Sequence, residues 1–135
     1  MMMRYLATYA ATLLVLAVLD FVWLGFIAKP LYQKGIGHLM AADPNFAAAL
    51  LFYVLFPVGI LLFAVLPQSI GDWRGSMVAA AVFGFFCYAT YGLTNLATLK
   101  SWPTMLVFTD IAWGVLLTTL CAAAGKYVWG LWSAP

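Results

Sequence analysis

Two aspartates inside long apolar runs are the residues best placed to do chemistry. Asp20 lies in "LDFVWLG" and Asp110 in "TDIAWG", and each is followed three residues later by a tryptophan, Trp23 or Trp113, on the same helical face. Placing an aspartate in such a run costs about 2.5–3.5 kcal/mol on insertion scales. Acids kept at that cost usually face a cavity, where they can bind a cation, carry a proton or exchange protons with a substrate.

Other polar side chains recur at helical spacing near these acids. Taken together, they predict one intramembrane polar pocket, formed by Asp20, Trp23, Tyr53, Tyr88, Tyr91, Asn95, Lys100, Asp110 and Trp113. Lys100 is included because a long lysine side chain can reach an acid by snorkelling. The alternative for the uncharged members is ordinary interhelical hydrogen bonding, worth around 0.6 kcal/mol each. Two intramembrane acids cost more than such bonds return, which favours a functional pocket.

The elements that position these residues must be membrane helices. The chain has 135 residues, of which 67% are hydrophobic and only 7% charged, whereas soluble domains carry about 25% charged residues. This composition predicts a multi-pass membrane protein. The net charge of +2 gives no reason to expect a nucleic-acid partner. The predicted partners are membrane lipids, and a second copy of the chain or another membrane protein remains possible.

Metal and disulfide chemistry find little support in the sequence. Cys87 and Cys121 lie in apolar runs without a CxxC motif or histidine partners, and the chain contains no glutamate. The spacing typical of di-metal carboxylate sites is also absent. His38, the only histidine, lies in the first loop. We therefore predict no metal and no cofactor.

Four apolar segments are long enough to cross the hydrocarbon core, which takes about 20 residues. They cover about residues 5–28, 46–66, 76–99 and 104–132. Pro57 falls inside the second segment and predicts a kink there. We expect the first segment to be retained rather than cleaved as a signal peptide, because Asp20 interrupts it and no small-x-small site follows. The predicted fold is an all-α, compact bundle of four transmembrane helices with a kinked second helix, forming a single domain over residues 1–135.

The two acids are expected at similar depth in one leaflet. Asp20 lies roughly 12 Å before the end of the first segment, and Asp110 roughly 9 Å after the start of the fourth. In a four-span chain, the first and third loops share one face of the membrane. The opposite leaflet offers little beyond four threonines: Thr8, Thr12, Thr118 and Thr119.

Charge does not set the orientation, because three basic residues flank each side of the membrane. The segment "ADPNF" predicts Asp43 as the N-cap of the second helix and Pro44 at its first position. The longest connection, "KPLYQKGIGHLMAADPN", is typical of an interfacial turn or a short helix.

Three stretches resemble a known bacterial family. "LDFVWLG", "YQKGIGHLMAADPNFAAALLFYVLFPVG" and "YATYGLTNLATLKSWP", the last followed by "TDIAWG", are similar to membrane proteins of domain-of-unknown-function family 2177. The resemblance covers almost the whole chain and implies a small four-helix protein of the bacterial inner membrane, with no established activity. Family members often carry an aspartate where this chain has Gly92, so a third acid of the same face is missing here.

Three functions fit these residues. In the favoured one, the pocket binds or transports a small polar solute, a proton or a cation, with Asp20 and Asp110 as switchable charges. In the second, the protein is a lipid-modifying enzyme or the membrane partner of one. In the third, it is a structural subunit whose polar face meets a partner helix, and small residues such as Ala80 and Gly84 pack at helix contacts.

Overall fold

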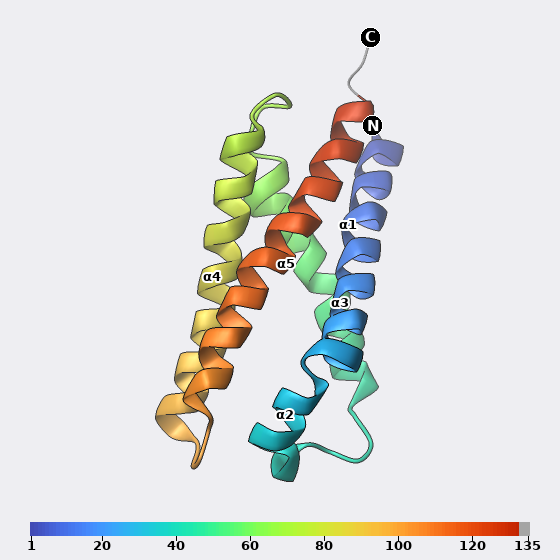
Figure 1. The fold of residues 1–135 in the computed structure, drawn as a ribbon. Helices are drawn as coiled ribbons and strands as arrows, with labels where there is room; N and C mark the ends of the chain where they lie inside the picture. Colours follow the sequence, from blue (N-terminus) through green and yellow to red (C-terminus); the bar gives the residue numbers. More distant parts are fainter. Residues whose placement is uncertain (133–135) are drawn as a thin grey trace.

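The computed structural model describes residues 1–132 and is helical along most of that length. Four of its helices are long and apolar enough to cross a membrane, which confirms the predicted fold class. They run antiparallel in chain order, and the first and last bring the two ends of the described chain to the same end of the bundle (Figure 1). Their bounds are Met2–Ile27, Phe46–Val65, Trp73–Thr98 and Thr104–Leu131, each within three residues of the predicted span.

The first span consists of helix α1, Met2–Val22, and a π-helical turn, Trp23–Ile27. The long connection that follows forms a short helix, as the sequence predicts: α2 covers Lys29–Ile36, and a 3₁₀ turn covers Gly37–Leu39. Helix α2 lies under the bundle at the end opposite to the chain termini (Figure 1).

The second span consists of α3, Phe46–Ile60, and another π-helical turn, Leu61–Val65. The predicted N-cap is wrong, because Asn45 rather than Asp43 caps α3 by accepting a 3.1 Å hydrogen bond from the backbone N–H of Ala48. The helix starts two residues later than the proline signal suggests. Pro57 lies inside α3, where it has no N–H to bond the carbonyl four residues earlier. The change to π geometry follows one turn after it.

The last two spans are single helices, α4 (Trp73–Thr98) and α5 (Thr104–Leu131). Asp72 caps α4 by accepting a 2.8 Å hydrogen bond from the N–H of Gly75, and the helix therefore starts three residues before the predicted position. Ser101 turns the chain between the two helices with a φ of 57°.

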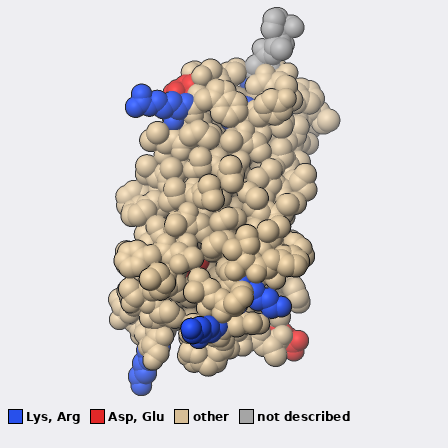
Figure 2. All heavy atoms as spheres, viewed as in Figure 1, with Lys and Arg blue, Asp and Glu red and all other residues tan. Residues whose placement is uncertain are grey.

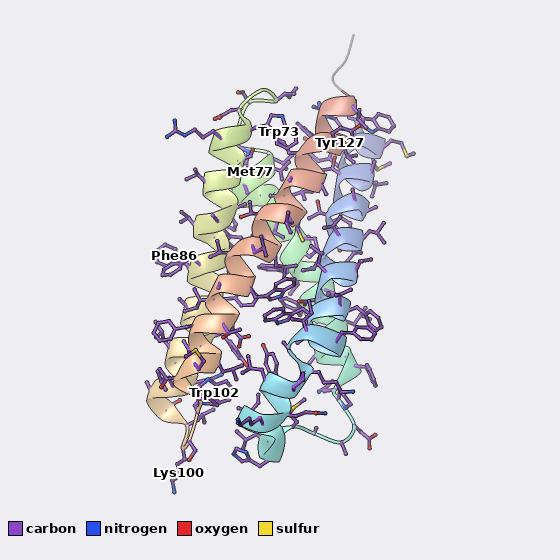
Figure 3. The ribbon with its side chains drawn as sticks, viewed as in Figure 1. Trp73, Met77, Phe86, Lys100, Trp102 and Tyr127 are labelled. Atoms are coloured by element: carbon purple, nitrogen blue, oxygen red, sulfur yellow. The ribbon has the colours of Figure 1, made fainter. Side chains whose placement is uncertain are left out.

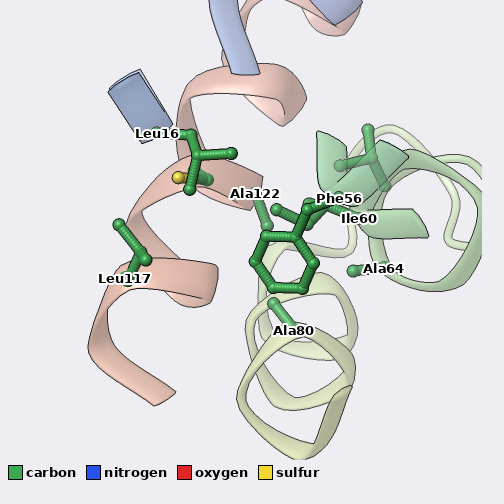
Figure 4. Packing of buried hydrophobic residues seen from close by; sticks show 9 residues of the cluster. Leu16, Phe56, Ile60, Ala64, Ala80, Leu117 and Ala122 are labelled. Atoms are coloured by element: carbon green, nitrogen blue, oxygen red, sulfur yellow. The ribbon is translucent and has the colours of Figure 1, made fainter. Parts of the chain in front are cut away.

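The core lies in the half of the bundle nearer to the chain termini. Figure 4 shows Leu16 of α1, Ile60 of α3 and Leu117 of α5 converging, all fully buried. Small residues let α4 and α5 approach closely. A Cβ atom at Gly84 would stand only 2.5 Å from the carbonyl oxygen of Gly114, so this contact requires glycine.

The surface is divided as a membrane protein requires. In Figure 2, charged atoms gather at both ends and a broad band of uncharged residues separates them. A small group of acidic atoms shows in the lower half of that band. Large apolar side chains are exposed on every span, as lipid contact requires; examples are Leu14, Phe63, Phe86 and Leu116.

Candidate binding site

Asp20 joins three helices through its carboxyl group. It is the last buried residue of α1 and is 5% exposed. Its Oδ2 accepts a hydrogen bond of 2.9 Å from the Tyr53 hydroxyl of α3, and its Oδ1 accepts one of 3.1 Å from the indole N–H of Trp113 in α5. Both bonds come from donors, so they orient the carboxyl group and stabilise its ionised form.

Asp110 joins α5 to the short helix α2. It is 2% exposed, and its Oδ1 accepts a hydrogen bond from the Tyr32 hydroxyl. Burial and this bond raise the pKa of Tyr32 above its ordinary value, because an ionised phenol beside a carboxylate is unfavourable. Tyr32 therefore stays a donor to Asp110 over the physiological pH range.

The two tryptophans of the Asp-x-x-Trp segments meet face to face. The rings of Trp23 and Trp113 have centroids 4.5 Å apart and planes 4° apart. Trp113 donates to the aspartate of the other segment, and the N–H of Trp23 faces Tyr32, the partner of Asp110, without hydrogen-bond geometry of its own. The two segments are thus joined by the stacked rings and by the bond from Trp113 to Asp20.

A π-helical turn positions Tyr32 beneath Asp110. It begins at Trp23, one turn after Asp20, and leads directly into α2. A π turn holds more residues than an α turn, so it changes the direction in which the following side chains point. Tyr32 thereby comes under α5, where Asp110 lies. π-helical turns often occur at functional sites.

A cavity of about 550 Å³ lies beside Asp20. Its walls combine Asp20, Leu24 and Cys87 with seven aromatic residues from all the surrounding helices: Trp23, Tyr32, Phe52, Phe56, Tyr88, Tyr91 and Trp113. Tyr88 fits against α5 only because Gly114 has no side chain, since a Cβ there would overlap the ring. The cavity is therefore an aromatic chamber with one carboxyl group in its wall.

A second cavity, of about 610 Å³, lies between α1 and α3 on the lipid-facing side. It shares Asp20 and Leu24 with the first cavity, and Tyr53 also contributes to its wall. The other lining residues are apolar or small: Ala17, Phe21, Gly25, Pro44 and Phe46. Asp20 thus stands at the boundary between the aromatic chamber and the membrane side of the bundle.

Three of the predicted pocket residues, Asn95, Lys100 and Asp110, lie outside both cavities. Asn95 is half-buried one turn from Tyr91, whose side chain it approaches, and does not line the chamber. Lys100 is exposed and points away from the bundle at its lower end (Figure 3). It cannot neutralise an acid from there. Gly92 packs against Val107 of α5.

The sequence analysis missed two polar residues. Tyr32 belongs to the first loop, and no sequence signal places a loop helix under a particular span. Lys126 was treated only as a flanking charge, yet it is 1% exposed and donates a 2.6 Å hydrogen bond to the Ser69 carbonyl. The expectation that the opposite half holds little beyond threonines is therefore wrong. Lys126 closes the end of the bundle away from the chamber.

The described part of the chain contains no cluster of side chains that could hold a metal ion. No group of three or more His, Cys, Asp or Glu side chains occurs within residues 1–132. Asp20 and Asp110 each have protein donors as partners instead.

An all-helical chain with four apolar spans is a multi-pass membrane protein. It belongs to the family described as predicted membrane protein (DUF2177), which it matches over residues 5–127. The resemblance noted in the sequence is thereby confirmed. No curated protein and no solved structure is detectably similar to this chain.

Proposed function

We propose that this protein binds a small polar solute, a proton or a cation within the membrane, with Asp20 and Asp110 as its ionisable groups. The observation that carries this proposal is a buried carboxyl group, Asp20, held by two hydrogen-bond donors in the wall of a chamber. An acid kept in the membrane at this cost marks a ligand or proton site. Each oxygen of Asp20 accepts one of these bonds and retains capacity for a ligand.

Binding is favoured over passage across the membrane. Both cavities lie in the half of the bundle that contains α2. Fully buried Thr8, Val65 and Ala122 fill the other half, and Lys126 closes its end. Transport through the bundle would require this core to separate.

The structural-subunit alternative is less well supported. Tyr53 and Trp113 satisfy Asp20, and Tyr32 satisfies Asp110, all from the same chain. A partner helix is therefore not needed to compensate the acids. An enzymatic role would need a substrate placed against an acid–base pair, and the chamber presents one carboxyl group among rings.

We further propose that the protein resides in the bacterial inner membrane, with lipids as its main contacts. Its spans are helices, whereas proteins of the bacterial outer membrane are β-barrels. The exposed apolar side chains on all four spans provide the lipid contact. Association with a second copy or another membrane protein would use the same faces.

The test compares Asp20→Asn with Asp43→Asn, a change to an exposed acid outside both cavities. Purified protein in detergent is screened by thermal unfolding against inorganic cations, amines and neutral polar solutes. A ligand that binds the folded state raises the unfolding temperature by mass action. We expect a class of ligands to stabilise the wild type and Asp43→Asn but not Asp20→Asn.

A growth assay adds an independent measurement. We expect Asp20→Asn and Asp110→Asn to fold with near-normal stability but to fail to restore the fitness of a strain lacking the gene. Stable Asn variants that restore fitness fully would refute a role for ionisation at these positions. No Asp20-dependent stabilisation by any ligand class would refute the binding proposal.

A further inference from the structure

We infer that the ligand of the chamber is an organic cation, an ammonium group with apolar substituents, which reaches Asp20 from the membrane side between α1 and α3. This inference rests on the proposed binding function and narrows its ligand class. It is drawn from the chemistry of the chamber wall, from the shared position of Asp20, and from the surroundings of the second cavity.

The chamber wall selects for positive charge. Asp20 is the one acidic residue among those that line it, and seven aromatic residues surround it. The face of an aromatic ring carries negative charge density that attracts cations. Stacked aromatic walls of this kind hold substituted ammonium groups, which have no strong hydration shell to lose. An anion would meet both the carboxyl group and the ring faces and would be repelled.

The same wall does not suit a bare inorganic ion or a sugar-like solute. Calcium takes six to eight oxygen ligands, and magnesium requires a near-ideal octahedral shell. The chamber offers one carboxyl group, some tyrosine hydroxyls and mainly ring carbon. Its volume of about 550 Å³ also suits an organic molecule far better than a single ion. A polyol would leave most of its hydroxyls without partners.

The second cavity can hold the apolar substituent of the organic cation. Phe21 and Phe46 line it, and both are largely exposed on the lipid-facing side. Because Asp20 and Leu24 belong to both cavities, one molecule can direct its charge to the carboxyl group and its apolar part toward the lipid. Amphiphilic cations partition into the membrane interface, and Asp20 lies near the end of the first span that leads into α2. Entry from the side therefore needs no opening of the buried core.

The test uses two probes of nearly equal shape. Benzyltrimethylammonium carries a charge, and 2,2-dimethylpropylbenzene is its neutral carbon analogue. Binding to the purified full-length protein in a non-ionic detergent is measured by calorimetry. We expect the cation to bind about tenfold more tightly than the neutral analogue, and Asp20→Asn to remove most of that difference. Asp43→Asn serves as the matched control and should bind like the wild type.

Ring contact is tested separately at Tyr91, whose partial exposure makes substitution tolerable. Tyr91→Phe keeps the ring and Tyr91→Leu removes it, so the leucine variant should bind the cation about threefold more weakly than the phenylalanine variant. The comparison of the two probes on the wild type needs no variant, so it decides the question even where a variant fails to fold.

The outcomes separate this inference from the proposed function. Equal binding of both probes, or no binding of the cation, overturns the organic-cation inference. If another ligand class still stabilises the wild type but not Asp20→Asn, the proposed function stands without it. If no class does so, both fail.

Discussion

Asp20 and Asp110 occur in similar sequence segments, but they accept hydrogen bonds from different helices. Asp20 receives donors from two long spans, α3 and α5, and also borders both cavities. Asp110 receives its donor from the short helix α2. At the scale of single residues, Asp20 is therefore the ligand-facing acid, and Asp110 fixes the helix that covers the chamber.

Removing one donor from Asp20 should cost a measurable part of the stability. We predict that Tyr53→Phe lowers the free energy of unfolding in detergent by about 1 kcal/mol, because it deletes the 2.9 Å bond to a buried carboxyl group. Tyr127→Phe, at a residue that is 61% exposed, provides the control and should change little. Equal effects of the two substitutions would show that the bond to Asp20 contributes nothing.

The bond between Tyr32 and Asp110 predicts a loss of stability at high pH. The folded protein raises the pKa of Tyr32, whereas the unfolded chain titrates it near its ordinary value of about 10. The stabilisation is thus complete below about pH 10 and is lost as the pH rises above it. We expect the unfolding free energy of the wild type to fall as the pH rises above about 10, and Tyr32→Phe to show a smaller fall. An identical pH dependence in both proteins would contradict this assignment.

At the scale of elements, the contact between α4 and α5 supports the chamber. Glycines on both helices let them approach, and Tyr88 of α4 lies flat against α5 at Gly114. The ring can line the chamber only in that position. The π-helical turn after α1 acts similarly on the other side by redirecting α2.

A methyl group at this contact should therefore disturb both packing and the chamber. We predict that Gly114→Ala destabilises the protein by about 1–3 kcal/mol, because the Tyr88 ring must move. Gly130→Ala is the control on the same helix, since its Cβ would meet nothing closer than 3.9 Å. In a Tyr88→Ala background, the cost of Gly114→Ala should largely disappear. A cost that persists there would locate the strain elsewhere.

At the scale of the whole molecule, the two ends of the bundle have different roles. The end that contains α2 holds the chamber, and the end that contains Lys126 is closed by its bond to Ser69. The two ends of the bundle face opposite sides of the membrane. The first and third connections lie on the chamber side, and the second connection lies on the closed side.

Single cysteines should report that arrangement directly. In a background with Cys87→Ala and Cys121→Ala, we predict that Asp43→Cys and Lys100→Cys react with a membrane-impermeant maleimide from the same side of intact vesicles. Gly71→Cys should react only from the other side. All three positions are exposed, so access does not limit the reaction. Labelling of Asp43→Cys and Gly71→Cys from one side would be incompatible with four spans. The same experiment fixes the orientation that the basic residues leave open.

The four spans could be predicted from the amino-acid sequence, and the same reading predicts a common depth for Asp20 and Asp110. Both follow from local rules, because a run of about 20 apolar residues must cross the membrane and the helical rise fixes the depth of each residue. The same rules place Trp23 and Trp113 on the faces of the acids.

Which side chains contact one another depends on how the helices pack, and the sequence does not show this. Tyr32 bonds to Asp110 because a π-helical turn redirects α2, and no periodicity in the sequence signals such a turn. Asn95 shares a helical stripe with Tyr91 but lies outside the chamber, and Lys100 follows the end of α4. Helix rotation is set by close packing at Gly84 and Gly114. Such contacts join residues far apart in the chain, so they cannot be derived from the spacing within one helix.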